Sequence, residues 1–428
     1  MAPLTHLQQI GPCSTLVVSH PIVELDFPGL LERFHITHHF LGLDSCVVAS
    51  TQYTMQDGLM FSILFPMLRT LIETHAPISV RLEGNEATSD VYLVQLPSID
   101  LSHVVDFSGK HNLWEALESQ LVWNFETQTD LPLWRIEVLA RNIVIFAVHH
   151  VIGNGMSCMV FHLNLFQALQ EGHHENSPPS VQVPTTTILL PPIECPTNRA
   201  IHPPGPSSMD ESPLCMVWLP HPNDPQPLNT CLLTGILCAR HCGILHRGLH
   251  TQHNTHIDHL CAHDNPVRYK WLAMLVAISL RSVAGVGDEV ICNYQSVHLI
   301  SSALNTDFSW KAAACIAREL QVQKRKSREG LGTLQFLLGQ YGEKHKSGLT
   351  LSNLGRIRAH MVEGRWTIGG TVFTQCNIII GSAFSINITG DPTGALNFSF
   401  CWGETNLDSA FIEMFISLFW EAFRSMVT

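Results

Sequence analysis

Residues 143–155 read IVIFAVHHVIGNG, and within them a strand pattern changes abruptly into a turn pattern. The first six residues are all apolar and rich in β-branched and aromatic side chains, which predicts a strand buried on both faces. Two glycines then flank Asn154, as in tight turns, and residues 156–170 return to helical spacing. The stretch therefore predicts a mixed α/β fold that places the imidazoles of His149 and His150 where the core gives way to a cleft.

A histidine at such a strand end has two interpretations. Its near-neutral pKa lets it take a proton from an attacking hydroxyl or amine, which makes His150, supported by His149, a candidate general base. The alternative is a pair of structural histidines that cap the strand. A doublet alone decides little, because the chain has 25 histidines and three such doublets. Only this doublet ends an apolar strand and precedes a glycine turn.

The composition favours a folded protein with a large core. The chain has 428 residues, of which 45% are hydrophobic and 14% charged, which excludes disorder for most of it. A net charge of -12 disfavours a general nucleic-acid binder. The longest apolar run, ten residues from Trp271, is about half the 20 that a membrane helix needs. Thirteen scattered cysteines fit a reducing cytoplasm better than a disulfide framework.

One compositional break divides the chain. Residues 178–227 hold fourteen of the 24 prolines, and such a segment continues neither a helix nor a central strand. We therefore predict an N-terminal lobe over residues 1–175, a proline-rich crossover over 176–228 and a C-terminal lobe over 229–428.

Both lobes show helix and strand patterns. Helices are predicted at residues 60–72, 271–283 and 408–426, the last with Asp408 as its N-cap. Residues 372–380 and 396–401 resemble a pair of neighbouring strands. Further strands are predicted at 78–82, 91–94, 134–139, 143–148, 289–294 and 347–353.

These residues together resemble a known family. Residues 131–135 (LPLWR) and 143–157 are similar to the HHxxxDG region of the chloramphenicol-acetyltransferase-like (CAT-like) superfamily. Its members include condensation domains, plant BAHD acyltransferases and fungal alcohol acetyltransferase-like proteins, and the last group is the most similar. The resemblance covers about two-thirds of the chain in the family's order, and its further matches are Leu41-Gly42, Val47, Tyr53, Ser352-Asn353-Leu354-Gly355, Thr374-Gln375, Gly381 and Leu396–Trp402.

The resemblance implies a two-lobe architecture, a pseudo-dimer in which each lobe is a mixed sheet with flanking helices and the active-site channel runs between them. Acyl-CoA enters on one side and the acceptor on the other. The second histidine, His150, deprotonates the acceptor, which attacks the thioester directly. The family's motif aspartate is structural and commonly pairs with an arginine. Here Asn154 stands in its place beside Gly155, and Arg135 is the candidate partner.

Three sets of residues are candidates for supporting roles. Ser352 and Asn353 are expected to stabilise the oxyanion, or else to satisfy their own turn. Gln375 is expected to line the channel, or else to serve strand pairing. Lys324, Arg325 and Arg328 are expected to bind the phosphates of coenzyme A, or else to form a solvated helix end.

Residues 231–275 depart from the family pattern. Four cysteines and seven histidines lie between Cys231 and His263, but no CxxC spacing occurs. Tetrahedral zinc sites typically draw on paired spacings of that kind, so we expect no metal and a compositionally biased surface segment.

The resulting hypothesis is an acyl-CoA-dependent O-acyltransferase, with acetyl-CoA as the default co-substrate and a hydroxyl of a small apolar metabolite as acceptor. No bound cofactor is expected, and neither nucleic acid nor a membrane span is involved. One alternative is condensation-type ester or amide formation from an acyl group on a carrier protein. Another is a member without catalysis that binds a ligand or partner.

Overall fold

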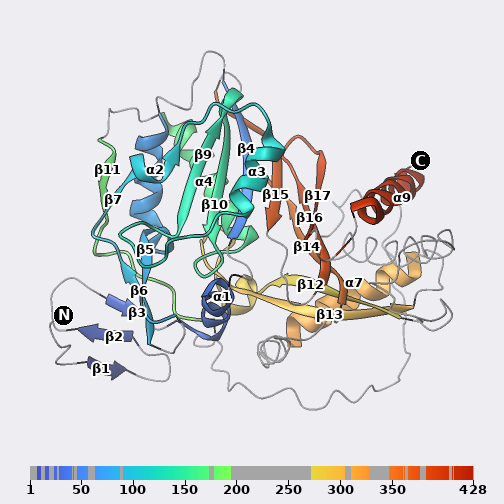
Figure 1. Ribbon diagram of the computed structural model, residues 1–428, viewed down its shortest axis with the longest axis horizontal. Coiled ribbons are helices and arrows are strands. Elements are labelled where there is room, and N and C mark those ends of the chain that lie inside the picture. The colour runs from blue at the N-terminus through green and yellow to red at the C-terminus, as the bar shows by residue number, and fades with distance from the viewer. Residues whose placement is uncertain are drawn as a thin grey trace.

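The computed structural model describes residues 7–10, 15–18, 24–26, 28–40, 42, 46–55, 63–86, 90–172, 178–193, 271–303, 310–326, 347–359, 361, 365–375, 382–403, 407 and 409–427. Within them the fold is mixed α/β, as the sequence predicts. The described residues form three five-stranded sheets and one two-stranded sheet. Two of the five-stranded sheets, with flanking helices, form the bulk of the molecule, and the third, called the smaller sheet below, lies at the N-terminal end (Figure 1).

The predicted strand lies at the centre of the first large sheet. Its order is β15-β4-β10-β9-β8, where β10 (Ile143–His149) runs antiparallel to β4 (Cys46–Thr54) and β9 (Trp134–Leu139). The edges are β8 (Val105–Asp106) and β15 (Thr367–Gln375). Both faces of β10 are covered. Phe146 stacks on Phe161 of α4 (Gly155–Glu171), with ring centroids 3.8 Å apart, and Ile145 packs in the cluster of α3 (Leu113–Leu121) on the other side. This double cover explains why the strand is apolar at every position.

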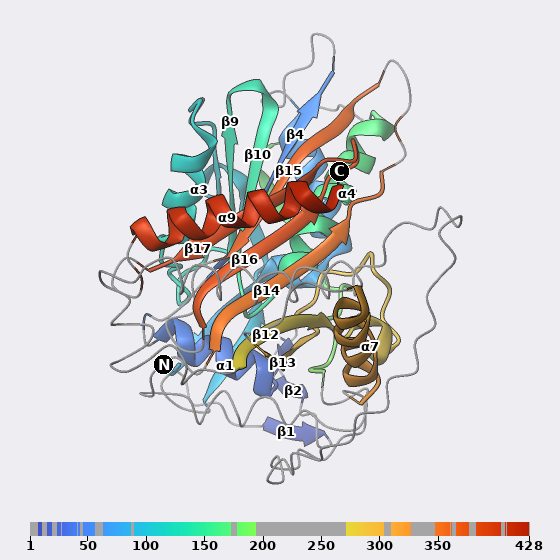
Figure 2. The same cartoon turned by 90° about the vertical axis from the view of Figure 1, so that its right-hand side faces the viewer.

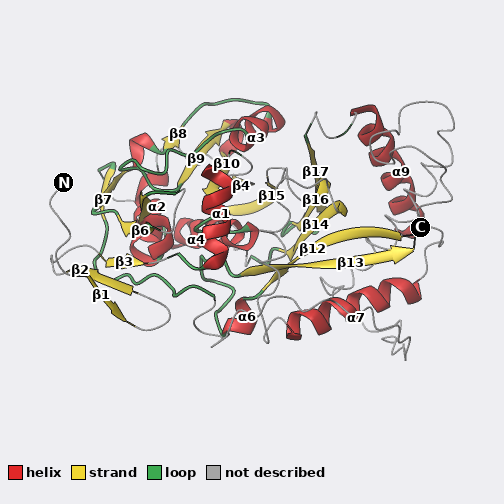
Figure 3. Ribbon diagram, turned by 60° about the horizontal axis from the view of Figure 1, so that its bottom comes forward, coloured by secondary structure: helices red, strands yellow, loops and turns green. Residues whose placement is uncertain are grey.

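The second large sheet has the order β13-β12-β14-β16-β17. Its strands are β12 (Trp271–Ser279), β13 (Gln295–Ala303), β14 (Ser347–Arg356), β16 (Ser382–Gly390) and β17 (Leu396–Trp402). Helix α9 (Ser409–Val427) lies across β14, β16 and β17 (Figure 2), and α7 (Trp310–Lys326) runs alongside β13 (Figure 3). Apolar side chains of both helices and one face of the sheet form a second core.

The remaining elements frame the first sheet. Two further helices, α1 (Leu30–Phe40) and α2 (Leu64–Thr74), lie in the N-terminal half of the chain. A short helix, α6 (Arg281–Ala284), follows β12. The smaller sheet has the order β1-β2-β3-β6-β5. Its strands are β1 (Leu7–Ile10), β2 (Thr15–Val18), β3 (Glu24–Asp26), β5 (Val80–Gly84) and β6 (Val91–Gln95). A two-stranded sheet pairs β7 (Ser98–Asp100) with β11 (Ser180–Gln182). Three short 3-10 helices are described, η2 (Ala76–Ser79), η3 (Leu101–His103) and η4 (Ala140–Asn142).

Two predicted elements are wrong. Residues 271–283 form strand β12 followed by α6 rather than one helix, because a short continuous apolar run fits a buried strand as well as a buried helix. Residues 289–294 form a turn, a bend and an irregular segment outside any sheet, and the strand begins at Gln295. The predicted cap Asp408 lies outside the described residues.

The predicted pairing of residues 372–380 with 396–401 is also wrong. Strand β15 pairs with β4 of the first sheet, while β17 pairs with β16 of the second. The two strands instead meet across the layers, where the Ser399 hydroxyl donates to the Phe373 carbonyl at 2.8 Å. A strand from the C-terminal part of the chain therefore completes the sheet that carries β10, and this crossing ties the two sheets together.

The first part of the proline-rich crossover is packed against the body of the protein. Strand β11 pairs with β7, and Ile193 is buried beside Cys292 and Tyr294. The rest of the crossover lies outside the described residues, so the division into lobes at residues 176–228 stays a prediction. Among the helices that the structure describes, none is long and apolar enough to cross a membrane.

Candidate active site

His149 is the last residue of β10 and is fully buried. The backbone N–H of Val151 donates to its Nδ1 at 3.1 Å, so the lone pair of the neutral ring lies on Nδ1. Its ring meets His39 and Phe125 edge-to-face. His149 therefore packs against the site and, through its hydrogen bond to Val151, fixes the turn after β10.

His150 points to the junction between the two halves of the chain. Its ring stacks on His35 of α1, with centroids 3.8 Å apart and planes 16° apart. The amide nitrogen of Gln295, at the start of β13, lies 3.3 Å from His150 Nε2 and 3.5 Å from His35 Nε2. An amide N–H can only donate, so His150 Nε2 is the acceptor here. A neutral imidazole with its lone pair on Nε2 is the form that a general base requires.

The site gathers five buried histidines, of which the motif supplies only two. His35, His38 and His39 come from α1 and share one face of that helix, because residues three and four positions apart are neighbours on a helix surface. The sequence by itself assigns no function to the doublet His38-His39. Its spacing with His35 was the one signal that could have linked it to the site.

Burial lowers the pKa of two of these imidazoles, those of His35 and His149. It holds the pKa of His149 well below the ordinary histidine value, and the neighbouring His39 and His150 lower it further. Burial also lowers the pKa of His35, and the nearby His150, His38 and His149 lower it further. The charged form loses its hydration in such a site and is repelled by any second imidazolium, so His35 and His149 resist protonation.

Asn154 caps helix α4 and contacts an arginine from the other half of the chain. Its Oδ1 accepts hydrogen bonds from the Ser157 backbone N–H at 3.2 Å and from Arg281 Nη1 at 3.2 Å. The partner of the motif residue is thus Arg281, and the prediction of Arg135 is wrong. Arg135 instead stacks on Trp123, 3.9 Å from the ring centroid, and donates to Gln120.

Arg281 is 0% exposed and carries its charge without a carboxylate. Its Nη2 donates to the Ser157 hydroxyl and to the Cys292 carbonyl, both at 2.9 Å, and within the described part of the chain it makes no salt bridge. Burial lowers its pKa. A buried charge that is hydrogen-bonded but not neutralised costs free energy of folding, and Asn154 is where a carboxylate would remove that cost.

Asn154→Asp is therefore expected to raise the unfolding free energy at pH 7 by about 1–3 kcal/mol, because it turns a neutral hydrogen bond to Arg281 into a charge-assisted one. Urea unfolding of the variant and the parent measures the difference. Asn112→Asp is the matched control, since Asn112 caps α3 through its side chain but contacts no arginine. Aspartate and asparagine are equivalent caps, so the control should change little. Equal shifts in both variants would contradict the buried-charge argument.

Gly155 lets the motif approach the second sheet. A Cβ at this position would lie 2.7 Å from the ring of Phe373 on β15 and 2.8 Å from Leu354 on β14. Any side chain here would displace the buried ring of Phe373 and the side chain of Leu354. The glycine is therefore required by packing between the halves of the protein rather than by backbone conformation.

The other predicted site residues lie on strands of the second half. Asn353 Oδ1 accepts from the Gly355 N–H at 2.9 Å, as expected of a turn that satisfies itself, while Ser352 is buried on β14. Gln375 ends β15 opposite Val47 and is half-buried. None of the three makes a described contact with His150. Their assignments as oxyanion and channel residues stay predictions.

The predictions for the basic run and for the cysteine-histidine segment are not tested by the part of the chain that the structure describes. Lys324 and Arg325 lie in the last turn of α7, while Arg328 and residues 231–263 lie outside the described residues. Among the described residues no group of three or more histidine, cysteine, aspartate or glutamate side chains is arranged to hold a metal ion. Cys158 is buried in the core beneath β4, and burial raises its pKa.

The chain is similar in sequence to one curated protein over nearly its whole length. This relative is the probable alcohol acetyltransferase crmB of Aspergillus fumigatus, which is 20% identical over 460 residues, covering 92% of this chain and 98% of the relative. No family model matches the chain.

The fold is similar to several solved structures. Polyketide synthase associated protein 5 from Mycobacterium tuberculosis has a TM-score of 0.54 at 13% identity, covering 90% of this chain and 96% of its own. The starter condensation domain of rhizomide synthetase RzmA has a TM-score of 0.55 at 11% identity, with coverages of 90% and 93%. The first condensation domain of the CDA synthetase has a TM-score of 0.52 at 13% identity, with coverages of 91% and 96%. These likenesses show that the chain shares the mixed α/β fold of the condensation domains and of polyketide synthase associated protein 5.

Proposed function

We propose that the protein transfers an acyl group from acyl-CoA, with acetyl-CoA as the default donor, to a hydroxyl of a small apolar metabolite. The observation that carries the proposal is the position of His150. Its ring is held between His35 of α1 and Gln295 of β13, with Nε2 as a hydrogen-bond acceptor at the junction of the two halves. The relative crmB, named a probable alcohol acetyltransferase, supports an alcohol acceptor, and the RzmA domain, solved in complex with C8-CoA, supports an acyl-CoA donor.

In the proposed reaction His150 Nε2 takes the proton of the acceptor hydroxyl as its oxygen attacks the thioester carbonyl carbon. The C–S bond then breaks, coenzyme A leaves as the thiolate, and the proton on His150 returns to that sulfur. The transfer is direct and uses no acyl-enzyme. Gln295 Nε2, which occupies the lone pair of His150 in this structure, must give way to the acceptor hydroxyl.

Incubation of the purified protein with acetyl-CoA and a panel of apolar alcohols and phenols tests the proposal. We expect acceptor-dependent release of free thiol together with a product whose mass has gained one acetyl group. Thiol release that is independent of the acceptor indicates hydrolysis. If all acceptors fail while acetyl-CoA still binds in a thermal-shift measurement, the proposed donor and acceptor pair is wrong.

A second candidate function is condensation of an acyl group delivered on a carrier protein. The fold likeness to the condensation domains of the RzmA and CDA synthetases favours it. The same assay with an acyl thioester of N-acetylcysteamine, which mimics the carrier arm but lacks the nucleotide, separates the two. Turnover with this thioester and none with acyl-CoA supports the condensation reaction.

A further inference from the structure

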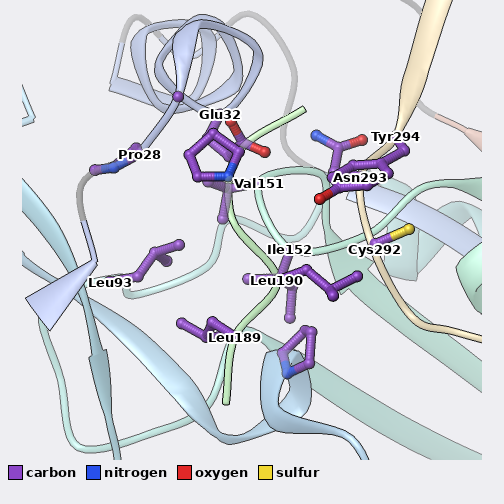
Figure 4. Close-up of a pocket in the computed structure, with 13 residues that line it drawn as sticks. Pro28, Glu32, Leu93, Val151, Ile152, Leu189, Leu190, Cys292, Asn293 and Tyr294 are labelled. Carbon is purple, nitrogen blue, oxygen red and sulfur yellow. The ribbon is translucent and has the colours of Figure 1, made fainter. Parts of the chain in front are cut away.

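A pocket opens beside the histidine cluster, and none of the residues so far assigned a catalytic role lines it (Figure 4). Its walls come from the start of α1, from the turn after His150 and from the packed part of the proline-rich crossover. Leu93, Val151, Ile152, Leu189 and Leu190 make most of the lining apolar. Two polar side chains, Glu32 and Asn293, also face it, and a mostly apolar pocket with a few placed polar groups is the usual form of a small-molecule site.

Asn293 is the unusual group in this lining. It is only 4% exposed, yet neither its Oδ1 nor its Nδ2 has a hydrogen-bond partner among the described residues. Buried amides are nearly always hydrogen-bonded, because burial without a partner costs free energy of folding. A side chain left in this state lacks a partner that a ligand would supply.

The backbone around Asn293 is held firmly. The Cys292 carbonyl accepts from Arg281 and from the Ser157 hydroxyl, and the Cys292 N–H donates back to Ser157. These bonds anchor the segment to α4 next to the motif, so Asn293 does not have to be ordered when a ligand binds, which preserves affinity. The buried charge of Arg281 thus has a positioning role for the pocket.

The two polar side chains specify the chemistry of a ligand group. The carboxyl group of Glu32 offers oxygen atoms that accept hydrogen bonds. Asn293 offers both a donor and an acceptor, and matching both requires a ligand group that gives and takes hydrogen bonds. A hydroxyl does this, whereas an ammonium group only donates.

Two segments, helix α1 and the residues before β13, each contribute one residue to the pocket and another to the histidine site. Glu32 precedes His35 by three residues on α1, a rise of roughly 4.5 Å. Asn293 precedes Gln295 by two residues, which span at most roughly 7 Å of chain. His35 and Gln295 are the two groups that contact His150. A hydroxyl between Glu32 and Asn293 is therefore separated from one at His150 by about four to six covalent bonds of an extended chain.

We propose that this pocket recognises a second hydroxyl of the acceptor, so that the substrate is an apolar diol whose reacting hydroxyl sits at His150 and whose other hydroxyl binds Asn293 and Glu32. The inference rests on the proposed function for the identity of the reacting group. The pocket itself, and its preference for a hydroxyl, rest on Asn293 and its surroundings alone.

The test compares 1,5-pentanediol with 1-hexanol, in which a methyl group replaces the second hydroxyl. We expect kcat/KM with acetyl-CoA to favour the diol by about 100-fold, because a site built to hydrogen-bond a hydroxyl rejects its apolar analogue. In Asn293→Leu this ratio should fall to near one. Gln167→Leu, which removes an exposed amide from α4, is the matched control and should keep the parent ratio. 1,2-Ethanediol, whose oxygens are only about three bonds apart, is too short to reach both sites and should lose the preference.

Equal rates with the diol and 1-hexanol, in both the parent and Asn293→Leu, overturn the pocket proposal while leaving the acyltransferase function standing. A preference for 5-amino-1-pentanol over the diol at neutral pH contradicts the hydroxyl assignment. If no alcohol is acylated, the proposed function fails, and ligand-observed NMR with the same compounds then tests the pocket by binding alone. Tighter binding of the diol than of 1-hexanol, lost in Asn293→Leu, supports it, and equal binding of the two overturns it.

Discussion

Replacing His150 with alanine is expected to lower acceptor-dependent kcat/KM by about 10²- to 10⁴-fold, which is the usual contribution of a positioned general base. The reason is that neither neighbouring histidine, His149 or His35, is placed to replace His150 as the base. His149 cannot substitute, because its Nδ1 is held by the Val151 N–H within the turn. The His35 ring stacks on the His150 ring with centroids 3.8 Å apart. After removal of His150, the His35 imidazole is therefore displaced from the acceptor hydroxyl by about this stacking distance. The measurement is thiol release at several acceptor and acetyl-CoA concentrations.

The pattern of the kinetic constants distinguishes catalysis from damage to the fold. Loss of the base should lower kcat and leave the KM for acetyl-CoA near the parent value, since the base acts in the transition state. His103→Ala is the matched control, because His103 is an exposed histidine outside the cluster. Parent-level turnover in His150→Ala would remove the general-base assignment. Loss of both turnover and acetyl-CoA binding in His150→Ala would indicate a structural role instead.

Mild acidification is expected to destabilise the protein strongly. His35, His149 and His162 are all buried, and burial lowers the pKa of each, that of His162 to about 4. In the unfolded chain each titrates near pH 6.5. Below that pH the unfolded state binds protons that the folded state rejects, so the unfolding free energy falls as the pH falls. Three such groups lower it by roughly 4 kcal/mol per pH unit once the pH is below their unfolded pKa.

Urea unfolding at pH 7.5, 6.0 and 5.0 measures this slope. The variant His162→Gln tests its origin, because His162 lies in the core away from the cluster, where Nε2 donates to the Ala49 carbonyl and Nδ1 accepts from the Tyr53 hydroxyl. Its slope should be smaller by about 1.4 kcal/mol per pH unit, whatever its absolute stability. An unfolding free energy that stays constant from pH 7.5 to 5.0 would show that the buried histidines accept protons without cost.

Local patterns in the sequence predicted single elements well and their partners poorly. Strand β9 matches its predicted bounds, and β10 and α4 match to within one residue, because apolar periodicity and the glycine turn act within a few residues. Residues 271–283 failed as a helix, since an unbroken apolar run carries no periodicity to read. The strand pair at residues 372–380 and 396–401 failed because pairing depends on which surfaces remain to be covered after the sheets form.

The sequence alone revealed the chemistry of the motif: a buried strand, two imidazoles at its end, and a glycine turn that contains Asn154. Tertiary structure alone decided what those groups meet. Arg281 lies 127 residues from Asn154, and Gln295 lies 145 residues from His150. The three histidines of α1 reach the site only because that helix packs against the end of β10. Such contacts follow from the total free energy of packing two sheets and their helices together, and no short stretch of the chain encodes that sum.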